Sequence, residues 1–317
     1  MNPLMNPRVV TIGVHIVDVL TRPVESIPAG QDTVLVDQIR LTAAGSAAGT
    51  AVDLAKLGLD VISLGAIGDD ELGDFLVAVM TRHGVDVTRL ARRSTDQTSA
   101  SILPIRPDGG RPSFHVPGAN LTVSAAEVSG LDGAAVVHLG GTDVTFGLND
   151  PAFFAQLERA RSSGTLVTMD LLSNMEDLVK GAAAFLPYVD YFLPNEEQAF
   201  AMTGESDPAE AALALRAMGV PGVVITLGER GSLLHAGDGP AEPIPALPVE
   251  AVDTTGCGDA YCAGFIAALV HGHGPSVAAR WGTAAAATVA QGLGSDACLT
   301  GLDEVVALAG KIEISNM

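Results

Sequence analysis

The stretch from residue 253 to 266 reads Asp-Thr-Thr-Gly-Cys-Gly-Asp-Ala-Tyr-Cys-Ala-Gly-Phe-Ile, and it holds the residues best suited to chemistry. Gly256 and Gly258 flank Cys257, so the backbone can turn tightly there and remain bare. An apolar run over residues 260–270 follows and ends at a glycine-containing segment, a pattern typical of a helix. The glycines should therefore lie at a helix N-terminus, where free N–H groups and the positive end of the helix dipole attract an anion.

Asp259 stands in the first turn of this predicted helix, at the edge of the anion site. A carboxylate in that place can take the proton from a hydroxyl that attacks the anion. An anion hole with an adjacent base is the equipment for phosphoryl transfer to an alcohol. The helix dipole predicts a lowered pKa for Asp259. The alternative is an ordinary loop that leads into a core helix.

Two better-known glycine motifs are absent from the sequence. No Gly-x4-Gly-Lys-Ser/Thr occurs, which excludes a P-loop of the Walker type. A dinucleotide fingerprint would need a third glycine where the chain has Tyr261. The anion expected here is therefore held by a different arrangement of glycines.

Composition narrows the class of protein. The chain has 317 residues, of which 48% are apolar, enough for a large core. Its formal net charge of −20 disfavours nucleic acid and anionic membrane as partners. Three cysteines without a spaced framework fit a reducing cytoplasm, and no secretory signal or apolar run of membrane-spanning length is visible. We expect a cytoplasmic protein without a membrane or nucleic-acid partner.

Short apolar segments alternate with helical patterns along most of the chain. This alternation predicts an α/β fold with a mostly parallel sheet covered by helices on both faces. Its strands are expected at residues 9–14, 60–65, 135–139, 165–170, 191–193 and 222–226. The final helix is expected at residues 277–290, and its run of alanines permits either tight helix packing or the close approach of a flat ligand.

Two segments, approximately 15–42 and 98–118, have strand-like patterns outside this rhythm. They predict a small β lid inserted in a single domain that spans residues 1–317. A lid of this kind closes on substrate and excludes water. An exposed lid edge is also compatible with a homodimer.

Polar residues follow several of the predicted strands. Asp18 comes soon after the first strand and is a candidate ligand for hydroxyls, or a loop carboxylate. Asn195 and the bare turn over residues 226–231 follow later strands. Because ligand loops gather at the carboxyl ends of parallel strands, we expect a nucleotide to lie across these loops.

These motifs together resemble those of the ribokinase-like, or PfkB, carbohydrate kinases, over nearly the whole chain. The stretch Asp253-Thr-Thr-Gly-Cys-Gly-Asp259 resembles the C-terminal signature of that family, and residues 44–58 resemble its N-terminal signature. Gly65-x-x-Gly68-x-Asp70-x-x-Gly73, Pro194-Asn-Glu-Glu and Thr226-x-Gly228-x-x-Gly231 occur in the expected order. The resemblance implies a Rossmann-like αβα sandwich with a small β lid. It also implies ATP- and Mg²⁺-dependent phosphorylation of a small sugar or sugar derivative.

The resemblance also implies a role for each site residue. Asp259 matches the catalytic base, and Gly256, Cys257 and Gly258 match an anion hole that acts through backbone N–H groups. The remaining implied contacts are Asn195, Thr226, Gly228, Gly231 and Thr283 for ATP, then Asp18, Gly45 and Gly49 for the sugar, and Asp253, Thr255 and Gly294 for the potassium-type ion that some members bind.

Three positions depart from the family pattern. Gly49 stands where asparagine is usual, which leaves extra room and one amide fewer to read the sugar. Gln198 occupies a usually acidic place, so Glu197 becomes the candidate that orients Mg²⁺ through water. Asp170 is followed by two leucines in place of Pro-Asn.

The sequence predicts an ATP-dependent sugar kinase, and two other functions compete with it. One is a nucleoside kinase of the same fold. The lid contains few aromatic residues that could stack on a base, Phe114 being the clearest, and this scarcity argues against a nucleoside. The other is a non-catalytic sugar-binding regulatory protein, against which the retained Asp259 and its glycine turn argue.

Overall fold

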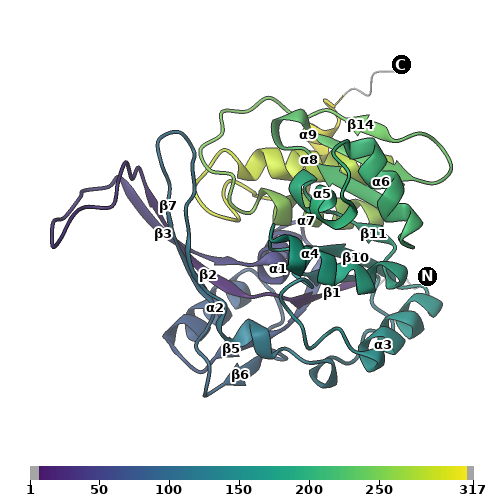
Figure 1. The fold of residues 1–317 in the computed structure, drawn as a ribbon, viewed down its shortest axis with the longest axis horizontal. Coiled ribbons are helices and arrows are strands. Elements are labelled where there is room, and N and C mark those ends of the chain that lie inside the picture. The colour runs from purple at the N-terminus through teal and green to yellow at the C-terminus, as the bar shows by residue number, and fades with distance from the viewer. Residues whose placement is uncertain (1–6, 313–317) are drawn as a thin grey trace.

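The computed structural model describes residues 7–312, and its centre is an eight-stranded sheet in the order β14-β13-β12-β11-β10-β9-β1-β4 (Figure 1). The six strands from β12 to β4 are parallel, whereas β13 and β14 are antiparallel additions at one edge. The strand bounds are β1 Arg8–Gly13, β4 Asp60–Leu64, β9 Val136–Gly140, β10 Leu166–Asp170, β11 Tyr191–Phe192, β12 Gly222–Thr226, β13 Ser232–Ala236 and β14 Glu242–Ile244. The predicted α/β fold with a mostly parallel sheet is confirmed.

Helices cover both faces of this sheet, as the unbroken apolar runs of its strands require. Val9 packs in the core on one face, and its neighbour Val10 packs in the core on the other face, because successive side chains of a strand point to opposite sides. The helix bounds are α1 Ser46–Lys56, α2 Glu71–Arg82, α3 Pro151–Ser162, α4 Glu176–Gly181, α5 Glu196–Thr203, α6 Pro208–Ala217, α7 Cys257–Val270, α8 Pro275–Val289 and α9 Leu302–Ala309. Within residues 7–312, no helix combines the length and apolarity needed to cross a bilayer.

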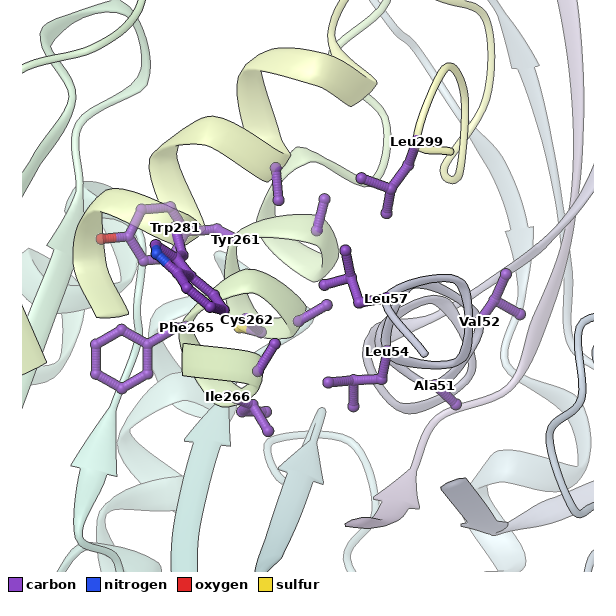
Figure 2. Packing of buried hydrophobic residues seen from close by; sticks show 14 of the residues in the cluster. Ala51, Val52, Leu54, Leu57, Tyr261, Cys262, Phe265, Ile266, Trp281 and Leu299 are labelled. Atoms are coloured by element: carbon purple, nitrogen blue, oxygen red, sulfur yellow. The ribbon is translucent and has the colours of Figure 1, made fainter. Parts of the chain in front are cut away.

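Helix α7 is the central helix of one core and is packed between α1 and α8. Figure 2 shows Leu54 of α1 and Leu57, the residue that follows α1, facing Ile266 and Cys262 of α7. On its α8 side, a β-carbon built on Gly264 would lie 2.5 Å from the carbonyl oxygen of Trp281, so only glycine permits this approach. The packing fixes the first turn of α7 relative to the start of α1.

The helix predicted at residues 277–290 is confirmed as α8, but the prediction that it is the final helix is wrong, because α9 follows. Helix α9 is short and keeps Val305 and Ala309 buried against the core that contains α8. Its two buried residues are four positions apart, the spacing of one helix face, so α9 carries a helical apolar period that the sequence prediction missed.

A second sheet, which we call the small sheet, has the strand order β3-β2-β7-β8 and projects from the body of the molecule (Figure 1). Its strands are β2 Ile16–Arg22, β3 Gln38–Ala44, β7 Ala100–Pro104 and β8 Phe114–Val116. A two-stranded sheet of β5 Ala66–Gly68 and β6 Ala91–Arg93 accompanies it.

The two faces of the small sheet differ in polarity. In the register of its strands, Asp18 is paired with Ser101, and Ser101 with His115, which puts polar residues on one face. The alternate positions carry apolar residues: Leu41 opposite Val19, Val19 opposite Ile102, and Ile102 opposite Phe114. The polar face therefore turns toward the cleft, and the apolar face is left exposed.

Candidate active site

The first turn of α7 forms the predicted glycine turn. Gly256 has a φ of 78°, and a β-carbon there would overlap the backbone of Ser295, so the position requires glycine. Cys257 directs its thiol away from the turn, toward the carbonyl oxygen of Ala286 at 3.6 Å. Burial raises the pKa of this thiol to about 12, so it stays protonated and uncharged. The Cys257 N–H donates to the carbonyl oxygen of Thr254 at 3.3 Å, a long bond within the turn. The turn offers its backbone N–H groups and helix polarity to an anion, as an anion hole requires.

Asp259 lies in the first turn of α7, half-buried beside the cleft. The prediction that the helix N-terminus lowers its pKa is wrong. Desolvation by the surrounding protein, with the charge of Asp18 as a second cause, raises the pKa of Asp259 to about 7. A base with a pKa near neutrality accepts a proton far more readily than an ordinary carboxylate does.

Two cavities open on either side of this turn. One has a volume of about 770 Å³ and the other about 810 Å³, and Thr226, Thr254 and Gly258 line both. Asp259 lines only the second cavity. The arrangement gives room for two small molecules that meet at the glycine turn. The carboxylate of Asp259 faces the molecule in the second cavity.

The first cavity contains most of the residues assigned to ATP. Thr226, Gly228, Gly231 and Thr283 all line it, together with Ala286 and Ala287 of α8 and Ala290, the residue that follows α8. Meanwhile Ala284 and Ala285 pack in the core. Tight packing of the alanine run is therefore confirmed for Ala284 and Ala285, while Ala286 and Ala287 border open space. The apolar wall suits a flat ring.

Asn195 lines the second cavity and caps α5. Its side-chain oxygen accepts from the Gln198 N–H at 2.8 Å, while the Gln198 side chain accepts from the Asn195 N–H at 2.9 Å. The buried amide of Gln198 also donates to the carbonyl oxygens of Leu171 and Ser173. Glu197 accepts a hydrogen bond from Asn174 and lies outside the residues that line either cavity.

Asp18 and Gly45, both predicted to contact the sugar, line the second cavity. Burial raises the pKa of Asp18 to about 6, opposed by a hydrogen bond from Ser101 and by the charge of Arg111. Gly49 does not line either cavity. It lies behind Asp259 instead, and a β-carbon built on it would overlap the carboxyl of that residue.

Asp253, Thr255 and Gly294 form one hydrogen-bonded cluster. One oxygen of Asp253 accepts from the N–H and the hydroxyl of Thr255, at 3.0 and 2.8 Å. Its other oxygen accepts from the Gly294 N–H at 3.0 Å. The cluster holds the strand-to-helix turn against the loop that contains Ser295.

The structure adds three residues that the sequence did not assign to the site. Arg111 enters the second cavity from the connection between β7 and β8. Phe146 lines the same cavity, whereas Phe114, the aromatic expected in the lid, lies on the outer face of the small sheet and is 62% exposed. Asp170 also lines the cavity, and burial raises its pKa well above the ordinary value, with the charge of Asp259 as a further cause. The alternation of inward and outward side chains along β8 could have predicted that Phe114 points outward. No local sequence pattern identifies Phe146 or Arg111 as residues of the site.

Known proteins match both the sequence and the fold. At 28% identity, the chain is similar to a fructokinase of Klebsiella pneumoniae over 87% of this chain and 89% of the relative. At 32% identity, it is similar to an aminoimidazole riboside kinase of Salmonella typhimurium over 71% and 73% of the two chains. The structure of a ribokinase of Arabidopsis thaliana, complexed with ribose and ATP, superposes with a TM-score of 0.80 at 22% identity and covers 96% of this chain and 99% of that one.

The model of the family described as pfkB family carbohydrate kinase matches residues 6–301. This match spans the small sheet, the glycine turn and both cavities. The chain therefore belongs to the pfkB family of carbohydrate kinases.

Proposed function

We propose that this protein transfers the γ-phosphoryl group of ATP to a hydroxyl of a small sugar or sugar derivative. One observation carries the proposal: the two cavities meet at the glycine turn, and Asp259 stands on one side of that meeting point. ATP fits the first cavity, with its flat ring against the alanine wall and its phosphates toward the turn. The sugar fits the second cavity, between Asp18 and Asp259.

The chemistry follows from this arrangement. The sugar hydroxyl forms a bond to the γ-phosphorus as the bond to the bridging oxygen of ADP breaks, and Asp259 takes the hydroxyl proton. Backbone N–H groups of Gly256, Cys257 and Gly258 stabilise the charge on the transferring oxygens. The raised pKa of Asp259 matches this role at neutral pH.

Carboxylates are the donors that suit a divalent ion here. Asp170 lines the second cavity, and hard oxygen ligands fit Mg²⁺. Mg²⁺ bound with the nucleotide would neutralise part of the negative charge of its phosphates. Glu197 remains our candidate for orienting its water shell, and Asp253, Thr255 and Gly294 remain candidates for a potassium-type ion.

The proposal extends to the organisation of the protein. Residues 1–317 form a single domain in which segments 15–42 and 98–118 make the lid. The protein acts in the cytoplasm, without a nucleic-acid or membrane partner, and forms a homodimer. The exposed apolar face of the small sheet, with Ile39, Leu41, Ile102 and Phe114, supports the dimer.

The test is a coupled ADP-release screen over pentoses, hexoses, ketoses, sugar acids and nucleosides, with ATP and Mg²⁺. We expect turnover on one or more sugars and weaker turnover on nucleosides. The relative named as a riboside kinase makes the nucleoside arm necessary. Preference for a nucleoside would replace the acceptor that we propose. ATP binding without turnover on any acceptor would favour a regulatory protein and refute the kinase assignment.

A further inference from the structure

The two cavities contain very little positive charge for a site that handles phosphates. Among the residues of the described chain that line them, Arg111 is the only one with a permanent positive charge. His115 also lines the second cavity, but burial lowers its pKa from the ordinary value of 6.5, so it is neutral at pH 7. Asp18, Asp170 and Asp259 line the same cavity with acidic groups. Phosphoryl transfer needs positive charge to balance the negative charge of the phosphates. Among the side chains of this site, Arg111 supplies that positive charge.

Arg111 reaches the glycine turn from the small sheet. It lies in the connection between β7 and β8, and its Nη1 donates to the hydroxyl oxygen of Thr255 at 2.9 Å. Thr255 immediately precedes Gly256, the first residue of the proposed anion hole, and Asp253 holds its backbone and hydroxyl. The guanidinium is therefore held next to the anion hole by an ordered partner.

Most of the hydrogen-bonding capacity of this guanidinium is unused. An arginine side chain has five N–H donors in a planar fork. Within residues 7–312, the bond to Thr255 is the one hydrogen bond that the Arg111 side chain makes, and no carboxylate forms an ion pair with it. A cation with free donors, fixed beside an anion hole and lining the cavity of the acceptor, is equipped to bind oxygens of a phosphoryl group.

We propose that Arg111 is a catalytic residue carried by the small sheet, and that its guanidinium binds the phosphoryl group during transfer. This inference rests on the proposed kinase function. The bond from the acceptor oxygen to phosphorus forms as the bond to ADP breaks, and the proton goes to Asp259. Arg111 exchanges no proton and stabilises the charge on the equatorial oxygens. Arg111 lies in the connection between β7 and β8, so the small sheet supplies this charge to the cleft.

Three variants test the role of Arg111. Arg111→Ala removes the charge and the fork, and Arg111→Lys keeps the charge but loses the fork. Arg106→Ala is the matched control, because Arg106 lies in the same connection, is exposed and lines neither cavity. Turnover is measured on the substrate that the wild-type enzyme prefers, and ATP binding is measured by calorimetry without acceptor. Binding of ADP with aluminium fluoride in the presence of the sugar reports affinity for a mimic of the transferring group.

Arg111→Ala should lower kcat by roughly 10²–10³-fold, the range for losing one donor to a developing anion. Its binding of the aluminium fluoride complex should weaken to a similar extent, while the Kd for ATP and the KM for the sugar change less than about threefold. Arg111→Lys should fall between alanine and wild type, and Arg106→Ala should match wild type.

A kcat of Arg111→Ala within about threefold of wild type would overturn the inference. A loss confined to the KM for the sugar would also overturn it, because Arg111 would then be a ligand of the acceptor. Either result leaves wild-type turnover, and with it the proposed function, intact. Absence of wild-type turnover on every acceptor is the separate result that refutes the function itself.

Discussion

Gly49 of α1 lies directly behind the carboxyl of Asp259, in contact so close that a β-carbon on Gly49 would overlap it. The two helices are locked in this relationship by the packing of Leu54 and Leu57 against α7 (Figure 2). Asparagine at residue 49, the residue that the sequence resemblance implies, would displace the base in this chain. The glycine therefore makes room for Asp259, a role that differs from the expected extra room for the sugar.

Gly49→Ala should lower kcat by roughly 10- to 100-fold, because a small displacement of a reacting group is costly in a site built on positioning. The Kd for ATP should stay within about threefold of wild type, since Gly49 does not line the first cavity. Gly181→Ala is the control: Gly181 is also helical, and a β-carbon there meets open space. Unaltered turnover in Gly49→Ala would mean that the base accommodates the methyl group.

The pH dependence of kcat/KM for the sugar should report the raised pKa of Asp259. The ionised form is the active base, so activity should fall as the pH decreases through about 7. Asp18→Asn should move this fall to lower pH, because the charge of Asp18 is the second cause of the raised pKa. Asp18 also lines the sugar cavity, so its replacement can change the absolute value of kcat/KM. The wild type and Asp18→Asn are therefore compared by the pH at which kcat/KM falls. An acidic limb near pH 4 in the wild type would contradict the environment that we describe for Asp259.

Gln198 shows why an acidic residue is absent at its position. Its amide donates to the carbonyl oxygens of Leu171 and Ser173, both at 3.2 Å, in a buried place. Gln198→Glu would turn these bonds into repulsion between oxygens, and we expect a loss of about 1–3 kcal/mol in the free energy of unfolding. Denaturant titration of both proteins measures the difference. Glu197→Gln, at a neighbouring and more exposed place, is the control and should keep wild-type stability. Equal stability of Gln198→Glu and wild type would contradict this account.

We expect the outer face of the small sheet to hold the proposed homodimer together. Ile102 is 52% exposed and Phe114 is 62% exposed, side by side on adjacent strands. Ile102→Asp would bury a charge at such an interface and should convert the dimer to a monomer in light scattering after gel filtration. Leu213→Asp, on α6 and 49% exposed, is the control and should stay dimeric. A wild-type monomer at micromolar concentration would refute the dimer.

The sequence predicted the six parallel strands of the central sheet, because their signals are local, and missed β13 and β14 at its edge. Strands such as β1 and β12 are short apolar runs, and the helix after Gly256 begins with glycines and a polar first turn. The geometry around Asp259 was not predictable in this way. Its pKa depends on burial and on Asp18, which is 241 positions away along the chain (259 − 18) and comes close only through the fold. Arg111 likewise meets Thr255 only through the fold, from 144 positions away along the chain.

The most direct test of the central claim is Asp259→Asn. The amide keeps the shape of the side chain and cannot accept the proton, so kcat should fall by roughly 10²–10⁴-fold, the usual range for a general base. ATP binding should hold or strengthen, because a negative charge near the phosphates is removed. Turnover and the Kd for ATP are therefore measured on the same preparation. A large loss of kcat with intact ATP binding is the result that we predict, and a kcat near that of wild type on the preferred sugar would contradict the assignment of Asp259 as the base.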